Sequence, residues 1–338
     1  MCAVSCFYLL LINVHHENTA SISVHQNVIG MIKRVICFSN PAYLSMRLGQ
    51  LVIKLPEVEN APHLPELVRR ESVRTVPIED IGVVVLDNKQ ITLTQGLMVA
   101  LLDNNCAIVT CNDQHLPIGL HLPLEGHNIQ NELFRKQLDA SEPLKKQMWQ
   151  QTVACKIMGQ ASVLREQGVD CPNMRAWARS VRSGDADNIE GRAAAFYWKN
   201  VFGDSAFVRG QEGEPPNNLL NYGYAVVRAI VARALVCAGL LPTLGIHHHN
   251  RYNAYCLADD IMEPYRPFVD RQVITMMQQW EDISVLTTEM KRDLLALSTA
   301  DVHIDGKRSP LMVAVQTTAT SVQKCFTGEA RKIIYPEW

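Results

Sequence analysis

The chain has 338 residues, of which 47% are hydrophobic and 20% are charged, and its formal net charge is −2 at pH 7. This length is sufficient for about two domains and for a hydrophobic core that needs neither disulfides nor a structural metal. The near-neutral charge excludes a nucleic-acid binder that is basic overall. The ten cysteines form no CxxC pair, which favours reduced thiols in a cytoplasmic protein.

Residues 1–30 contain no Lys or Arg, so the positively charged start of a secretory signal is missing. The apolar run at 6–14 is shorter than the roughly 20 residues that a membrane span needs. Met31 opens the pattern Met-Ile-Lys-Arg-Val-Ile-Cys-Phe, which is typical of the start of a domain. We therefore expect residues 1–30 to be an extension from an upstream start codon that adds no function.

Residues 31–125 are dominated by short β-branched or apolar runs between turn-forming residues, which predicts strands. The predicted strands cover 34–38, 50–55, 74–77, 81–86, 90–94, 107–111 and 117–121, and one helix covers 95–104. Short strands at this spacing favour a small β-sandwich. We expect this domain to hold subunits together, and the isolated His115 and His121 are not expected to be functional.

Residues 126–338 show helical periodicity, which predicts a larger all-α domain and an α+β fold class overall. Predicted helices cover 129–139, 142–167, 173–182, 219–240 and the residues after a cap at 187 or 188. The helix at 219–240 is apolar nearly all round. Arg228 and Arg233 near its middle would each cost about 2.5–3.5 kcal/mol in a bilayer, so a buried core helix is expected.

Two features of the helical domain remain ambiguous when the residues are taken alone. Residues 135–209 carry twelve Lys or Arg and eight Asp or Glu, and a solvated surface explains this local charge of +4 as well as a DNA-binding face does. Glu190 lies in the first turn of a predicted helix, where a carboxylate is more often a favourable charge than a metal ligand.

The stretch 244–267 combines three histidines with three carboxylates, namely His247, His248, His249, Asp259, Asp260 and Glu263. Carboxylates three or four positions apart share one face of a helix, so either aspartate can lie beside Glu263. Imidazole nitrogen and carboxylate oxygen together suit Mg²⁺ or Mn²⁺. Successive residues point in different directions, so the three histidines cannot all bind one ion. Two alternatives stay open: a metal site, or an exposed polar turn before a solvated acidic helix start.

Four segments, in this order and spacing, resemble the CRISPR-associated adaptation integrases, the catalytic subunits of spacer acquisition, with features of type II systems. They are 38–44 (Phe-Ser-Asn-Pro-Ala-Tyr-Leu), 76–82 (Val-Pro-Ile-Glu-Asp-Ile-Gly), 188–194 (Asn-Ile-Glu-Gly-Arg-Ala-Ala), and the stretch 244–267 with the preceding Asn-Tyr-Gly-Tyr at 221–224. The resemblance covers residues 31–338.

The resemblance implies a metal site built from one Glu, one His and a further carboxylate. Carried onto this chain, Glu190, His248 and Glu263 are both the catalytic residues and the ligands of Mg²⁺ or Mn²⁺. It implies an auxiliary position for Asp260 and leaves His247 and His249 as flanking residues.

The resemblance also implies the activity and the partners. The protein would be a metal-dependent DNA endonuclease and integrase that inserts short foreign DNA fragments as spacers into a CRISPR array. A 3′-hydroxyl would attack phosphodiesters at the repeat ends, and Arg192, Arg209 and Arg228 are candidates for contacts with the DNA backbone. The implied partners are double-stranded DNA, a second copy in a homodimer, and a small second adaptation subunit in a heterohexamer, in the cytoplasm and without a membrane. Two rival functions remain open: a non-catalytic DNA-binding homologue, and an unrelated metal-dependent phosphohydrolase.

Overall fold

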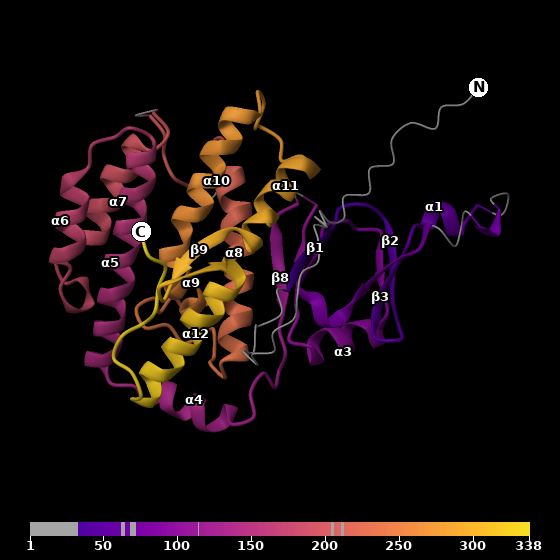
Figure 1. Ribbon diagram of the computed structural model, residues 1–338, viewed down its shortest axis with the longest axis horizontal. Helices are drawn as coiled ribbons and strands as arrows, with labels where there is room; N and C mark the ends of the chain where they lie inside the picture. Colours follow the sequence, from indigo (N-terminus) through magenta and orange to yellow (C-terminus); the bar gives the residue numbers. More distant parts are fainter. Residues whose placement is uncertain (1–32, 62–64, 68–71, 114, 204–205, 211–212) are drawn as a thin grey trace, which may run out of the picture. The chain divides into compact units, whose positions relative to one another are not determined.

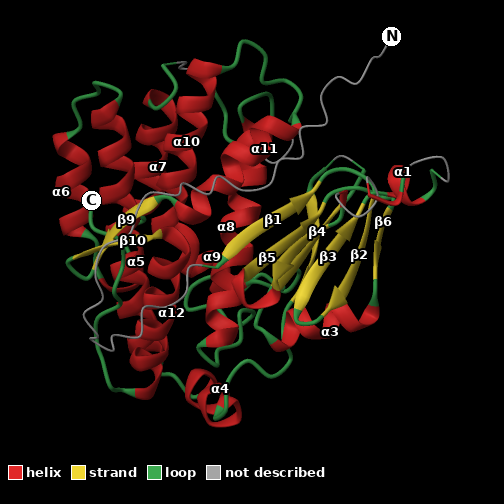
Figure 2. Ribbon diagram, turned by 45° about the vertical axis from the view of Figure 1, so that its right-hand side comes forward, coloured by secondary structure: helices red, strands yellow, loops and turns green. Residues whose placement is uncertain are grey.

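The computed structural model describes residues 33–61, 65–67, 72–113, 115–203, 206–210 and 213–338. The expected extension at 1–30 lies outside these residues. In the described part, strands dominate before residue 125 and helices after it (Figures 1 and 2), which confirms the predicted mixed α+β class. The division of the chain into domains at residue 125 stays a prediction.

The first sheet has the strand order β1-β5-β7-β8. These strands are β1 (Arg34–Phe38), β5 (Ile81–Leu86), β7 (Ala107–Cys111) and β8 (Pro117–His121). β1, β5 and β7 are parallel, and β8 joins β7 in the antiparallel direction. Five of the six residues of β5 are buried, as expected for a parallel strand covered on both faces. Helix α3 (Gln95–Asp103), which Thr94 caps by accepting from the Leu97 amide, precedes β7 in the chain.

The second sheet has the strand order β4-β3-β2-β6. Its strands are β4 (Arg74–Pro77), β3 (Gln50–Lys54), β2 (Ala42–Arg47) and β6 (Ile91–Leu93). The sequence analysis missed β2, in which buried Ala42 and Leu44 flank exposed Tyr43, and the four-residue helix α1 (Pro56–Glu59). The packing of the two sheets as a sandwich stays a prediction.

Nine helices follow in the described part of residues 126–338: α4 (Gln130–Leu138), α5 (Glu142–Glu166), α6 (Pro172–Ser180), α7 (Ile189–Asn200), α8 (Asn217–Cys237), α9 (Cys256–Met262), α10 (Arg266–Gln279), α11 (Thr288–Leu295) and α12 (Leu311–Thr327). α4 to α8 fall where helices were predicted. Short 3₁₀ turns add η1 (Ile78–Asp80), η2 (Ser183–Asp185), η3 (Glu263–Tyr265) and η4 (Ala296–Thr299).

The prediction that residues 126–338 are all α is wrong, because β9 (Asp301–Ile304) and β10 (Lys307–Pro310) form an antiparallel hairpin. Val302 and Ile304 are buried and alternate with exposed residues, which is the two-residue period of a strand. Asp305 and Gly306 have φ of 52° and 67°, the left-handed conformation that a tight hairpin turn of this kind requires.

Helix α8 runs through the core, as predicted. It is long and apolar enough to cross a membrane by length and composition alone, yet 83% of its most apolar window is buried inside the protein. The Nε of Arg233 donates to the Asn105 carbonyl at 2.5 Å, and the Nε of Arg228 lies 2.6 Å from Asp259 Oδ1. Both arginines therefore have partners within the fold.

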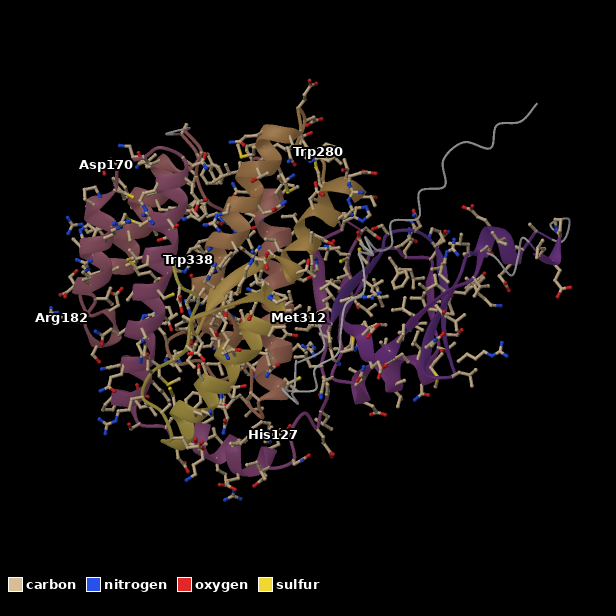
Figure 3. The ribbon with its side chains drawn as sticks, in the orientation of Figure 1. His127, Asp170, Arg182, Trp280, Met312 and Trp338 are labelled. Atoms are coloured by element: carbon tan, nitrogen blue, oxygen red, sulfur yellow. The ribbon has the colours of Figure 1, made fainter. Side chains whose placement is uncertain are left out.

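The end of the chain supports the elements that carry the candidate site. Trp338, labelled in Figure 3, packs on Phe268 of α10 with ring centroids 4.3 Å apart. A Cβ at Gly159 of α5 would approach the Trp338 ring to 2.7 Å, so a larger residue does not fit there without a shift. The C-terminal residue thus contacts both α5 and α10.

A buried ion pair links β5 to α11. Lys291 and Asp87 are only 3% and 2% exposed, and Lys291 Nζ lies 2.6 Å from Asp87 Oδ2. His115 Nδ1 lies 2.8 Å from the other carboxylate oxygen of Asp87. Because this carboxylate is out of water, its charge depends on these partners.

Lys291→Met is expected to lower the free energy of unfolding by about 3–5 kcal/mol, because it leaves a buried carboxylate without its cation. Urea unfolding measures this loss, with exposed Lys89→Met as the control that should change stability little. The double variant with Asp87→Leu should recover much of the stability. A Lys291→Met protein as stable as the wild type would contradict the assignment.

Candidate functional site

Hydrogen bonds from backbone amides hold the first turn of α7, where Glu190 lies. The Asp185 carboxylate accepts from the amides of Ile189 at 2.9 Å and of Glu190 at 3.0 Å. Asn188 adopts the left-handed conformation and caps the helix by accepting from the Gly191 amide at 3.3 Å. These hydrogen bonds give partners to N–H groups of the first turn that have none within the helix, and they fix the backbone position of Glu190.

Asp260 organises the loop that carries the histidines. Its carboxylate is fully buried and accepts from the amides of Ile246 at 2.7 Å, His247 at 3.0 Å and His248 at 3.2 Å. A Cβ at Gly245 would lie 2.3 Å from the His248 carbonyl oxygen and 2.8 Å from Asp260 Oδ2, which explains the glycine. The loop is therefore wound around one carboxylate.

The three histidines have different surroundings. His247 stacks on the buried Trp149 of α5, with ring centroids 4.1 Å apart. His248 Nδ1 lies 2.5 Å from Asp260 Oδ1, an arrangement that leaves Nε2 for another ligand. This hydrogen bond raises the pKa of His248, and Glu263 and Glu190 add to the increase against the effect of burial. His249 is exposed.

Glu263 follows α9 directly and is 5% exposed. Its Oε1 lies 2.9 Å from Arg266 Nε and its Oε2 lies 2.5 Å from Lys156 Nζ. Burial alone raises the pKa of Glu263, but Arg266 and Lys156 outweigh burial and lower it to about 2. Asp259 and Asp260 are buried as well, so the alternative of a solvated acidic helix start is wrong.

Lys156 of α5 brings the two glutamates together. Its Nζ lies 2.6 Å from Glu190 Oε1 and 2.5 Å from Glu263 Oε2, and its side chain is 12% exposed. Burial lowers the pKa of Lys156, but Glu263 and Glu190 outweigh burial and raise it. Two carboxylates from separate elements thus meet at one positive charge.

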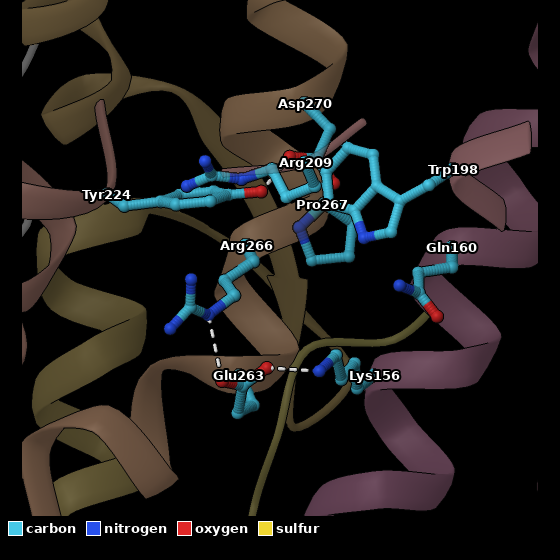
Figure 4. A pocket seen from close by; sticks show the side chains of 9 residues that line it. All are labelled: Lys156, Gln160, Trp198, Arg209, Tyr224, Glu263, Arg266, Pro267 and Asp270. Carbon is cyan, nitrogen blue, oxygen red and sulfur yellow. Dashed lines mark hydrogen bonds and ion pairs between the residues drawn. The ribbon is translucent and has the colours of Figure 1, made fainter. Parts of the chain in front are cut away.

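A pocket of about 230 Å³ opens beside Glu263 (Figure 4). Its lining is mainly polar and charged: Lys156, Gln160, Trp198, Arg209, Tyr224, Glu263, Arg266, Pro267 and Asp270. The guanidinium carbons of Arg209 and Arg266 lie 5.2 Å and 4.6 Å from the centre of the Tyr224 ring. His248 lines a different hollow, so the structure does not bring it into this pocket.

A buried carboxylate supports the wall of this pocket. Asp270 accepts from the hydroxyls of Tyr197 at 2.8 Å and Tyr224 at 2.5 Å. Burial raises the pKa of Asp270 to about 6, although both tyrosine hydroxyls act in the opposite direction. The hydrogen bonds fix the Tyr224 ring against which the two arginines lie.

The donor set fits a hard divalent cation, although its members are not in ligand geometry here. No group of three His, Cys, Asp or Glu side chains within the described ranges is arranged to hold an ion. Glu263 Oε2, however, is buried and lacks a hydrogen-bond partner of acceptable geometry in the described part of the chain, even though it lies at ion-pair distance from Lys156. Two carboxylate oxygens already converge on the Lys156 ammonium, and the Asp260 carboxylate orients the His248 imidazole.

The three arginines predicted to contact DNA differ in availability. Arg209 lines the pocket and donates to Asn217 Oδ1 at 2.9 Å. Arg192 of α7 lies over the Trp177 ring, 4.5 Å from its centre. Arg228 pairs with Asp259, and its side chain is 40% exposed.

Sequence reasoning missed Lys156 and Arg266 as parts of the site. For each residue the spacing to its polar neighbours fits a place in the site, but this spacing is informative only once the burial of those neighbours is known. Lys156 lies between Thr152 and Gln160 at four-residue spacing, and these two are 0% and 3% exposed, so the three form a polar stripe on a buried face of α5. Arg266 follows Glu263 by three positions, the spacing of neighbours on one helix face.

The chain resembles known proteins over most of its length. Residues 35–284 match the family model described as CRISPR associated protein Cas1. A CRISPR-associated endonuclease Cas1 from Neisseria meningitidis is 36% identical over 310 residues, covering 91% of this chain and 97% of the relative. One from Pyrobaculum aerophilum is 25% identical over 268 residues, covering 75% and 90%.

Three solved structures share the fold. A Cas1 protein from Thermotoga maritima aligns with a TM-score of 0.69 at 15% identity, covering 90% of this chain and 100% of that chain. A casposase bound to an integration product also aligns with a TM-score of 0.69, at 18% identity, covering 89% and 92%. A chain of a Cas6-RT-Cas1–Cas2 complex aligns with a TM-score of 0.68 at 17% identity, covering 92% of this chain but 37% of that one.

Proposed function

The chain belongs to the Cas1 family of CRISPR-associated proteins, and on this basis we propose that it is a metal-dependent DNA endonuclease and integrase. It inserts short foreign DNA fragments as new spacers into a CRISPR array. The observation that carries the proposal is the meeting of Glu190 and Glu263 at one positive charge, beside a histidine that a buried aspartate orients.

In this proposal Glu190, His248 and Glu263 hold Mg²⁺ or Mn²⁺. When bound, the ion lowers the pKa of the attacking hydroxyl and neutralises charge on the phosphoryl group. Asp260 fixes the His248 ring through Nδ1 and presents Nε2, and Arg266 keeps Glu263 ionised. His248 lines a different hollow from Glu263, so the histidine loop and Lys156 would have to move to complete the ligand set.

The nucleophile belongs to the substrate, so the protein needs no activated Ser or Cys. A 3′-hydroxyl of the incoming DNA attacks a phosphodiester at a repeat end, and the 3′-oxygen of the broken phosphodiester leaves. Arg209 and Arg266 line the pocket beside Glu263, where their charges offset those of the DNA phosphates. Such contacts position the backbone and read no bases.

The proposed partners are double-stranded DNA, a second copy of the chain and a small second adaptation subunit. The casposase bound to an integration product and the Cas6-RT-Cas1–Cas2 complex support DNA and Cas2 as partners. We propose that the strand-rich residues 31–125 form a sandwich that dimerises, that the small subunit joins two dimers into a heterohexamer, and that the assembly acts in the cytoplasm. The Neisseria relative supports a type II-like system.

Joining of a prespacer duplex to a supercoiled repeat plasmid is expected to need a divalent cation. Excess EDTA should abolish joining, and Mg²⁺ or Mn²⁺ should restore it, because hydroxyl activation depends on the ion. The assay measures plasmid-linked prespacer with the small subunit present. DNA binding without joining in the presence of the ion would favour the non-catalytic homologue. Turnover of small phosphoesters without joining would favour the phosphohydrolase, and full joining in EDTA would exclude the metal mechanism.

A further inference from the structure

Lys156 has an unusual position for a lysine in a helix that packs into the core. Its ammonium lies between two carboxylates that come from α7 and from the end of α9, at 2.6 Å and 2.5 Å. With the ammonium removed, Glu190 and Glu263 would face each other as like charges in a largely buried place, which is unfavourable. Figure 4 shows the contact of Lys156 with Glu263 at the edge of the pocket.

We propose that Lys156 is a built-in counterion that occupies the place of the divalent cation in the metal-free protein and gives it up when the metal binds. The inference rests on the proposed function, in which both glutamates are metal ligands. Mg²⁺–oxygen bonds measure about 2.0–2.1 Å, so an ion bound to the same two oxygens would overlap the ammonium. The two cations therefore compete for one position.

The pocket offers the displaced ammonium an acceptor. Gln160 lies one turn further along α5, is 3% exposed, and lines the pocket together with Lys156. Its Oε1 is buried and has no hydrogen-bond partner among the residues that the structure describes. An unpaired buried oxygen is costly, and a lysine four residues away is within reach of it. Lys156 thus has two positions, one on the carboxylates and one on Gln160.

The second position also gives Lys156 a role in the loaded site. The pocket that contains Gln160 is lined by Arg209 and Arg266, so an ammonium there adds a third positive charge beside Glu263. An anionic phosphate in the pocket would compensate this charge. Metal binding would displace the Lys156 ammonium toward Gln160, where its charge favours a phosphate in the pocket. The movement of Lys156 would therefore couple metal binding to phosphate binding.

Lys156→Met tests the competition without measuring catalysis. Calorimetric titration of the metal-free, DNA-free full chain with Mn²⁺ should show binding at least about tenfold tighter than in the wild type, because the competing ammonium is gone. Thermal melting in EDTA should show a lower Tm than the wild type, and Mn²⁺ should raise the Tm of the variant by more. Lys146→Met, an exposed change on the same helix, is the control and should leave both quantities unchanged.

Two further variants distinguish failure of the counterion role from failure of the proposed metal site. Lys156→Arg keeps the positive charge and should bind Mn²⁺ no more tightly than the wild type, which tests the idea even if the methionine variant does not fold. Glu263→Gln should remove the Mn²⁺ signal. If that signal depends on Glu263 but Lys156→Met leaves the affinity unchanged or weakens it, the counterion role is wrong and the proposed metal site stands. If no form of the chain binds Mn²⁺, both are wrong.

Discussion

Glu263→Gln is expected to lower strand transfer by at least about a thousandfold, which corresponds to about 4 kcal/mol of transition-state stabilisation. Glutamine keeps the size of the side chain but removes the negative charge that the proposed ion requires. Glu190→Gln should reduce the rate to a similar extent. The measurement is the rate of prespacer joining to a supercoiled plasmid at saturating Mn²⁺.

The same two variants are expected to differ in stability. Glu263 is the counterion of both Lys156 and Arg266 and its side chain is 6% exposed, whereas the Glu190 side chain is 23% exposed and pairs with Lys156. Glu263→Gln leaves buried cations short of one anion and should cost about 3–5 kcal/mol of unfolding free energy. Glu190→Gln should cost about 1 kcal/mol or less. Equal losses in urea unfolding would contradict this division of roles.

The histidine run supplies matched controls for the catalytic prediction. His248→Ala should abolish joining as the glutamate variants do, because it removes a ligand. His249→Ala and His247→Ala should both stay active because neither side chain is a proposed ligand, and His247→Ala should also lose some stability from the Trp149 stack. Loss of joining in His247→Ala together with an active His248→Ala would show that His247, and not His248, is the ligand.

The fold was predictable where a long or strongly apolar local pattern agrees with burial. β5 and β7 are runs of mainly β-branched residues, α5 is a long helix and α8 is apolar nearly all round, so local pattern and tertiary environment agree there. β2 was missed because its alternation covers only three residues before the exposed turn at Leu48 and Gly49. The β9–β10 hairpin was missed because β9 has only two buried residues and β10 has none, which is too short a pattern to recognise.

The site was predictable only as far as its motifs extend. Glu190, His248 and Glu263 came from the resemblance, and the role of each stays a prediction. The resemblance alone could not show that Asp260 binds three loop amides, because hydrogen bonds across a loop leave no periodic trace in the sequence. Lys156 was invisible for a different reason. A lysine within a helix is nearly always solvated, and only its two carboxylate contacts show that it belongs to the site.

Asp260→Asn is expected to reduce joining by about a hundredfold through the position of His248, without removing a proposed ligand. The carboxylate accepts from three loop amides and from the His248 ring, and an asparagine offers one oxygen where two now accept. Its NH₂ group would face donors, so the loop must shift and the ring must lose its orientation. Asp259→Asn is the matched control, because Asp259 is also buried, next to Asp260 in the chain, but binds Arg228 and Asn253 instead.

The pKa of His248 separates a role of Asp260 in orienting the ring from a role in stability alone. The Asp260 hydrogen bond raises the pKa of His248 above its usual value, so replacing the carboxylate should lower that pKa. Histidine ring titration by NMR in metal-free protein measures it. A His248 pKa that is unchanged in Asp260→Asn, together with wild-type joining, would show that the contact is not what orients the ring. A lowered His248 pKa together with weakened Mn²⁺ binding would show that Asp260 orients the His248 imidazole so that Nε2 faces the ion.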